Sequence, residues 1–155
     1  NRYLRPCESA DEMALREVYE DAILTCDKSV YSQEQIDAWS ALAYLPGVLD
    51  KPLKHGCGWV SRVNNTIEAF ALKYPHNRLA LLYCRGRSSR QGHATALLNQ
   101  IEADTLTDKP ITLKTEASLC SYQLLLRHGW TIISPEEIQI GGVHFSRYLM
   151  EKTLY

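Results

Sequence analysis

A change in the spacing of apolar residues near Trp59 constrains the fold more than any other feature of the chain. Before Trp59, apolar residues recur at helical spacing, at Leu15, Val18, Tyr19, Ala22, Ile23 and Cys26. After it, three runs of strand-forming residues follow one another, separated only by Asn64-Asn65 and by Pro75-His76-Asn77. Turns this short connect antiparallel strands. The sequence therefore predicts helices first and then a group of neighbouring antiparallel strands.

Capping residues, glycines and prolines place the other elements. Ser9 with Glu12, and Ser32 with Gln35, each match the capping box that opens a helix. A loop is predicted over about 50–58. The predicted strand segments are Arg2–Pro6, Trp59–Val63, Thr66–Tyr74, Arg78–Cys84, Ile111–Thr115, Trp130–Ser134, Glu137–Ile140 and Val143–Lys152. Two later helices are predicted, one with Ala94, Leu97, Leu98 and Ile101 on one face and one from about Ser118 to His128. The unit around 78–115 is expected to be parallel with a right-handed crossover.

The predicted order is β-α-α-β-β-β-α-β-α-β-β, a single α/β domain over residues 1–155. Its apolar fraction of 45% and charged fraction of 23% are those of a globular protein, and no apolar run approaches the length of a membrane span. The five cysteines form no Cys-x-x-Cys pair, which favours a reduced, cytoplasmic protein. The five histidines form no ligand cluster either, so we expect no metal site.

Charge is distributed unevenly along the chain, although the net charge is only -1. Residues 1–50 carry ten acidic residues against four basic ones, whereas residues 69–101 carry five basic residues and no acid. This separation suggests an anion bound by the middle of the chain and a cation near its first third. The alternative is that the charged residues form two solvated surfaces and bind no ligand. The near-neutral net charge disfavours a nucleic-acid partner, including aminoacyl-tRNA.

The stretch Cys84–Leu98 combines arginines and glycines immediately before a helical apolar pattern. Unpaired N–H groups and a partial positive charge make a helix N-terminus attractive to phosphates. Gly86 and Gly92 would let the backbone approach a ligand, and Arg87 and Arg90 would neutralise its oxygens. We therefore predict a pyrophosphate site, with a basic solvated turn as the alternative.

Residues Ser89–Ala94 resemble the motif Gln/Arg-x-x-Gly-x-Gly/Ala of the GCN5-related N-acetyltransferases (GNATs). The resemblance extends to Glu116-Ala117-Ser118 followed by Gly129-Trp130, and to the closing Met150-Glu151-Lys152. It implies a GNAT-like, mostly antiparallel seven-stranded sheet flanked by about four helices. It also implies transfer of an acetyl group from acetyl-CoA to a primary amine of a small molecule or peptide, by direct attack in a ternary complex.

The resemblance assigns the donor site residue by residue. The strand end would hold the pantetheine arm, and the loop and helix start would hold the pyrophosphate. The implied cofactor-binding residues are Leu82, Tyr83, Cys84, Arg87, Ser89, Arg90, Gln91, Gly92, His93, Ala94, Thr95 and Ser118. Ser89 departs from the motif, which has Gln or Arg at this position.

The catalytic residues are less clearly marked. Leu125 stands where many GNATs carry a tyrosine that protonates the departing thiolate. Tyr122 and Ser121 share that helix face and are candidate substitutes, with water as a further option. Glu116 is the candidate general base, and a helix-start residue is its alternative role. Tyr83 is a further candidate that could equally face the core.

The acceptor is expected among the first two helices and the last strand pair. Aromatic and acidic residues there suit a cationic amine: Tyr19, Tyr31, Trp39 and Tyr44 with Glu17, Glu20, Asp21 and Asp37. The rival hypothesis is a catalytically silent acyl-CoA-binding or sensing module, favoured by Ser89 and Leu125. No nucleic acid or membrane partner is expected, and a homodimer is left open.

Overall fold

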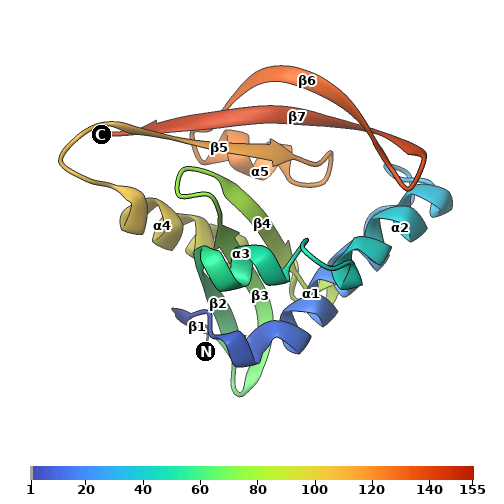
Figure 1. Ribbon diagram of the computed structural model, residues 1–155, viewed down its shortest axis with the longest axis horizontal. Coiled ribbons are helices and arrows are strands. Elements are labelled where there is room, and N and C mark those ends of the chain that lie inside the picture. The colour runs from blue at the N-terminus through green and yellow to red at the C-terminus, as the bar shows by residue number, and fades with distance from the viewer. Residues whose placement is uncertain (1) are drawn as a thin grey trace.

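The computed structural model describes residues 2–155, in which seven strands form two sheets (Figure 1). The first sheet is antiparallel in the order β1 (Arg2–Pro6), β2 (Cys57–Val63), β3 (Thr66–Lys73) and β4 (Leu79–Cys84). The second is antiparallel in the order β5 (Ile111–Ala117), β7 (Val143–Leu154) and β6 (Thr131–Ile140). The edge strands β4 and β5 face each other and share one parallel bridge, between Arg78 and Lys114.

Five α-helices accompany the sheets: α1 (Glu12–Leu24), α2 (Gln33–Ser40), α3 (Asp50–His55), α4 (His93–Thr105) and α5 (Tyr122–Arg127). Short 3-10 turns occupy Ser9–Asp11, Ala41–Tyr44 and Gly86–Ser88. In Figure 1, α4 and α1 lie on opposite sides of the first sheet, and α5 lies beside β5 and β6. No helix among residues 2–155 is long and apolar enough to cross a membrane.

The mixed α/β architecture and the predicted element order are confirmed, with four local corrections. The seven strands divide into two sheets, since among residues 2–155 the only bridge between β4 and β5 joins Arg78, immediately before β4, to Lys114 in the middle of β5. The loop predicted over 50–58 contains α3. The first capping box is Glu8 with Asp11, one residue before the predicted Ser9 and Glu12, whereas the Ser32–Gln35 box forms as predicted. The segments predicted on either side of Pro135 form one strand, β6.

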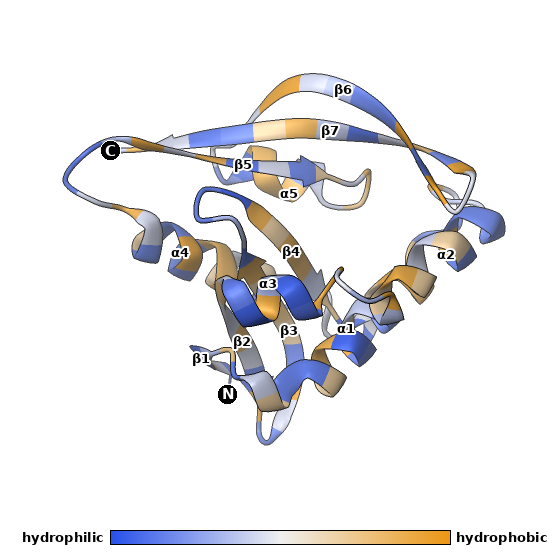
Figure 2. Cartoon of the chain, viewed as in Figure 1, coloured by the Kyte–Doolittle hydropathy of each residue, from blue (hydrophilic) through white to orange (hydrophobic). Residues whose placement is uncertain are grey.

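Two cores meet on β3, which is buried on both faces. Phe70 and Leu72 pack with α1, α2 and α3, whereas the intervening Ala69 and Ala71 pack under α4. The alternation follows from the period of two in a strand, and the small alanines let α4 lie close to the sheet. Figure 2 shows hydrophobic colouring along β3 and β4, while α3 is mostly hydrophilic. This weak apolar pattern explains why α3 was missed.

Candidate active site

A cleft opens where β4 and β5 separate. The backbone N–H of Lys114 donates to the carbonyl of Asn77 at 2.9 Å, and the hydroxyl of Thr115 donates to the carbonyl of Leu79 at 2.7 Å. Among residues 2–155, no backbone hydrogen bond joins the two strands beyond Leu79. The resulting cleft has a volume of about 1230 Å³. Because β4 is an edge strand, its free backbone groups face this cleft.

The loop at the start of α4 presents backbone N–H groups to the cleft. Arg90 and Gly92 both adopt left-handed conformations, with φ of 61° and 89°. The first helical bond of α4 joins the N–H of Ala96 to the carbonyl of Gly92. Within residues 2–155, the N–H groups of 93–95 therefore have no backbone acceptor. This arrangement suits an anion at the helix N-terminus, as the sequence predicted.

Three contacts from distant segments hold this loop. The carboxylate of Asp21 in α1 accepts a 2.9 Å hydrogen bond from the N–H of Gly86. A Cβ on Gly86 would lie 2.4 Å from the hydroxyl of Thr25, so this glycine is required by packing against α1 and not by ligand approach. At the other end, the guanidinium of Arg2 donates to the carbonyl of Gln91 at 2.8 Å. The loop is therefore shaped before any ligand arrives.

The arginines of the loop have different roles. Arg87 donates two hydrogen bonds to Glu68, at 3.0 and 2.7 Å, and Ser88 donates a third at 2.5 Å. Together these hydrogen bonds, first of all those from Arg87, lower the pKa of the buried Glu68 carboxyl to about 2. Arg85 donates to the carbonyl of Ile67. Arg90 lines the cleft and has no hydrogen-bond or ion-pair partner among the described residues.

The other predicted cofactor residues are placed as follows. Leu82, Tyr83, Cys84, Ser89, Arg90, Ala94 and Ser118 line the cleft. Gln91 and Gly92 are exposed beside it, and Thr95 is half-buried on the first turn of α4. The His93 ring is buried and lies 2.6 Å from the Ser61 hydroxyl, so only its backbone can serve a ligand. Burial lowers the pKa of His93.

Glu116 reaches the cleft but is bound to Arg78. The Arg78 guanidinium donates to both carboxylate oxygens of Glu116. This ion pair lies beside the bridge at which β4 and β5 separate. Because its oxygens already accept hydrogen bonds, Glu116 has fewer lone pairs for a substrate proton. The ion pair favours a role for Glu116 in holding the two sheets together. The role of Glu116 as the general base stays a prediction.

The geometry of α5 distinguishes between the candidates for the general acid, the group that would protonate the departing thiolate. The Tyr122 ring packs on the Tyr148 ring, with centroids 4.8 Å apart. Tyr122 does not line the cleft. Leu125 is buried. Ser121 does line the cleft, and its hydroxyl lies 3.1 Å from that of Ser118. The packing of Tyr122 favours a structural role, and its role as the acid stays a prediction.

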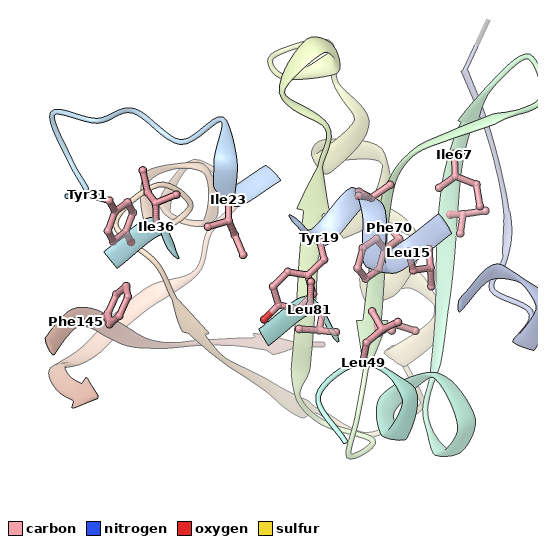
Figure 3. Close-up of a cluster of buried hydrophobic side chains, with 14 residues drawn as sticks. Leu15, Tyr19, Ile23, Tyr31, Ile36, Leu49, Ile67, Phe70, Leu81 and Phe145 are labelled. Atoms are coloured by element: carbon pink, nitrogen blue, oxygen red, sulfur yellow. The ribbon is translucent and has the colours of Figure 1, made fainter. Parts of the chain in front are cut away.

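An aromatic wall forms the other end of the cleft. The Tyr31 and Trp39 rings are in edge contact at 5.2 Å, and Phe145 of β7 lies 6.2 Å from Tyr31. Tyr19 stacks on Tyr83 at 4.2 Å, which places a ring of α1 on β4. Figure 3 shows Tyr31 and Phe145 gathered at one end of this cluster and Tyr19 towards the other. Tyr19, one of the residues expected near an acceptor, therefore contacts β4, and the acceptor site stays a prediction.

Tyrosines of this wall stay neutral. Burial raises the pKa of Tyr31 to about 12 and that of Tyr83 well above the ordinary range. Burial likewise raises the pKa of Tyr19. The hydroxyl of Tyr31 accepts a 2.9 Å hydrogen bond from the N–H of Leu119. These groups can donate hydrogen bonds but are poor proton acceptors near neutral pH.

The predicted acidic residues lie outside the cleft. Asp21 supports the loop, Glu20 accepts a hydrogen bond from Tyr44, and Asp37 accepts one from Gln33. Glu17 lies 4.0 Å from Arg85. The acids that do line the cleft are Asp27 and Glu116. Among the described residues, Glu17, Glu20, Asp21 and Asp37 thus do not line the cleft, and the cation site stays a prediction.

Three features of the cleft were missed from the sequence. The Arg2 contact to Gln91 and the Arg78–Glu116 pair join residues far apart in the chain. The sulfurs of Cys26 and Cys120 lie 3.7 Å apart at the cleft wall. No local pattern marks any of these contacts. No group of three or more His, Cys, Asp and Glu residues within 2–155 is arranged to hold a metal ion.

Comparison with solved structures identifies the fold. The chain superposes on a GCN5-related N-acetyltransferase from Rhodopseudomonas palustris with a TM-score of 0.88, at 19% identity over 99% of this chain and 96% of that one. PaiA N-acetyltransferase from Thermoplasma acidophilum, solved with coenzyme A, gives 0.75 at 16% identity and 99% coverage of both chains.

YncA from Salmonella typhimurium, solved with its cofactor acetyl-CoA, gives a TM-score of 0.66 at 16% identity, over 100% of this chain and 95% of that one. No protein-family model matches the sequence, and no curated protein matches it. The fold is therefore the GNAT fold, carried by a sequence that is at most 19% identical to these three. The expected GNAT architecture is confirmed.

Proposed function

We propose that this chain is an acetyl-CoA-dependent N-acetyltransferase that transfers an acetyl group to a primary amine of a small molecule or peptide. One observation carries the proposal: the unpaired N–H groups at the start of α4 lie at the same cleft as the free edge of β4. The first feature suits a diphosphate, and the second suits an extended amide-containing arm. Coenzyme A has both parts. One of the solved neighbours contains coenzyme A and another contains acetyl-CoA.

The donor is held mainly by backbone groups in this proposal. The N–H groups of 92–95 bind the diphosphate, and the unpartnered Arg90 neutralises one of its oxygens. The edge at Leu82–Cys84 pairs with the pantetheine arm as an additional strand would. An N–H of that edge also polarises the thioester carbonyl in the transition state. Arg87 is committed to Glu68 and supports the loop from behind.

Acetyl transfer forms a C–N bond and breaks the C–S bond of the thioester, and the proton that the nitrogen loses passes to Glu116 or to water. The amine attacks the thioester directly while both substrates are bound. It enters from the aromatic wall of Tyr31, Trp39 and Phe145, whose ring faces suit an amine close to the point of attack. Because a thiolate is a good leaving group, a weak acid is enough to protonate it. We assign that proton donation to the Ser121 hydroxyl or to water beside it, since Ser121 lines the cleft and Tyr122 does not.

A silent acyl-CoA-binding module is the second candidate. Leu125 occupies the position of the usual acid, and Arg78 engages the carboxylate of Glu116. These observations concern only proton transfer and leave the donor site intact. The two candidates therefore agree about binding and differ about turnover.

Two measurements on the unmodified chain separate these candidates. Calorimetric titration with acetyl-CoA tests the donor site, and release of free CoA across a panel of amines tests transfer. We expect saturable binding of acetyl-CoA together with amine-stimulated CoA release. Binding without release for any amine would support the silent module, and absence of binding would contradict both.

A further inference from the structure

Two cysteines from distant parts of the chain meet at the cleft. Cys26 follows the end of α1, and Cys120 lies in the turn between β5 and α5. Their sulfurs are 3.7 Å apart, a separation typical of an S–H···S contact. The two segments belong to opposite walls of the cleft, because α1 packs on the first sheet and the turn follows the edge strand of the second. The pair therefore bridges the two halves of the molecule.

The surroundings favour the thiolate form of one of these two cysteines. Cys120 is exposed and Cys26 is half-buried. The contact with the Cys26 sulfur, together with a hydrogen bond to the backbone of Asp27, lowers the pKa of Cys120 to about 7. The same contact raises the pKa of Cys26. Cys7 provides the contrast, since burial raises its pKa to about 12.

We propose that Cys26 and Cys120 form a peroxide-sensitive dithiol whose disulfide closes the acceptor side of the cleft. In the first step, the thiolate of Cys120 attacks one oxygen of a hydroperoxide. The O–O bond breaks, the other oxygen leaves as hydroxide or alkoxide and takes a proton, and Cys120 becomes a sulfenic acid. In the second step, the Cys26 sulfur attacks the Cys120 sulfur. The S–O bond breaks, and the hydroxide released takes the Cys26 proton to form water.

The oxidised bridge has a structural consequence. A disulfide brings the sulfurs from 3.7 Å to about 2 Å, so the two side chains, and with them the end of α1 and the β5–α5 turn, are expected to move closer together. Tyr31 is joined to this turn through Leu119, and Thr25 packs on Gly86 of the donor loop. Closing the bridge therefore displaces groups on both sides of the reacting centre. This regulatory part of the proposal rests on the proposed acetyl transfer, whereas formation of the bridge does not.

The bridge itself is tested by mass. The full chain is treated with hydrogen peroxide, alkylated, and digested without reduction. We expect the intact mass to fall by two hydrogen atoms and one crosslinked peptide to join Cys26 to Cys120. Cys57→Ser, which removes an exposed cysteine outside the cleft lining, serves as the control and should form the same bridge. Absence of this crosslink in both proteins would overturn the proposal.

The effect on function is tested in the same samples. Oxidation should lower amine-dependent CoA release about tenfold, since displacements on the order of 1 Å at a reacting centre are costly. Dithiothreitol should restore it, and Cys26→Ser should be insensitive to peroxide. Full activity of the crosslinked protein would overturn the proposed closure. Acetyl-CoA binding by the reduced protein is measured alongside, so that failure of the donor site is recognised separately.

Discussion

The two sides of the cleft are built in different ways. The proposed donor side is one continuous segment, from β4 through the loop to the first turn of α4, and most of the groups proposed to bind the donor are backbone. The acceptor side draws single side chains from separate elements, such as Tyr31 before α2, Trp39 within it and Phe145 in β7. A local motif can encode the first arrangement, whereas only the assembled fold produces the second.

The difference extends to how each side is held in place. The donor loop is fixed by charged and backbone contacts, including Glu68 with Arg87 and Asp21 with Gly86. The acceptor wall is held by ring packing and by one hydrogen bond, from the N–H of Leu119 to Tyr31. A single substitution should therefore be enough to disrupt the proposed donor side, whereas the acceptor wall should tolerate exchange of one aromatic ring for a similar one.

Gly92→Glu should have the largest effect on the donor side. It places a carboxylate at the predicted diphosphate site and a Cβ at φ of 89°, 3.1 Å from Arg2. We expect acetyl-CoA affinity to fall at least about 100-fold in a calorimetric titration, which corresponds to about 2.7 kcal/mol.

Gly142→Glu is the matched control for Gly92→Glu. It introduces the same side chain at φ of 80° in the turn between β6 and β7, where nothing lies within 4 Å. This variant should bind acetyl-CoA normally despite similar backbone strain. Equal losses in the two variants would mean that strain, and not the anion site, explains the effect.

Glu68→Gln should weaken the support of the donor loop. Because the folded protein holds the pKa of Glu68 at about 2, below its ordinary value of 4.5, the ionised carboxylate stabilises the fold at neutral pH. That contribution is complete above about 4.5 and is lost as the pH falls towards 2. We expect the variant to lose about 2–3 kcal/mol of unfolding free energy at pH 7, measured by urea denaturation.

The pH dependence provides the specific signature of Glu68. The stability difference between the wild type and Glu68→Gln should shrink steadily from pH 4.5 to lower pH. Glu17→Gln is the control, since Glu17 is exposed and lies 4.0 Å from Arg85. It should change stability little. A pH-independent difference for Glu68→Gln would contradict the assigned ionisation.

The fold was predictable where the chain carries periodic or capping signals. The turns at Asn64 and His76 predicted the antiparallel strands β2 to β4, and the box at Ser32 predicted the start of α2. Helix α3 was missed because residues 50–55 are mostly hydrophilic and contain Pro52. The division into two sheets was also missed, since a strand sequence does not show where hydrogen bonding to its neighbour ends.

The local geometry of the proposed donor site was predictable for a related reason, whereas its binding role stays a prediction. Backbone groups and glycines in one loop leave a local pattern, whose left-handed Gly92 is the clearest element. Ion pairs are different, because Arg87 with Glu68 and Arg78 with Glu116 join residues about 20 to 40 positions apart. From the sequence, Arg87 was assigned to a ligand, whereas in the fold its guanidinium pairs with Glu68. The meeting of Cys26 and Cys120 had no local signal at all.

Glu116→Gln should have an intermediate effect and tests whether the pair with Arg78 joins the two sides. If the pair holds the sheets together, Glu116→Gln and Arg78→Gln should each lower stability by about 1–3 kcal/mol, and the double variant should be little worse than either. Turnover should fall in parallel in both single variants. Loss of turnover confined to Glu116→Gln, with stability retained, would instead identify Glu116 as the general base.

The smallest expected effects distinguish two neighbouring residues on α5. Tyr122→Phe removes a hydroxyl whose ring packs on Tyr148 outside the cleft, so turnover should stay within about twofold. Ser121→Ala removes a hydroxyl that lines the cleft, and we expect kcat to fall about three- to tenfold with acetyl-CoA affinity unchanged. The loss is small because a thiol of pKa about 8.5 departs readily as the thiolate. A large loss in Tyr122→Phe with normal binding would reverse the assignment, and α5 would then have to turn its Tyr122 face towards the donor during the reaction.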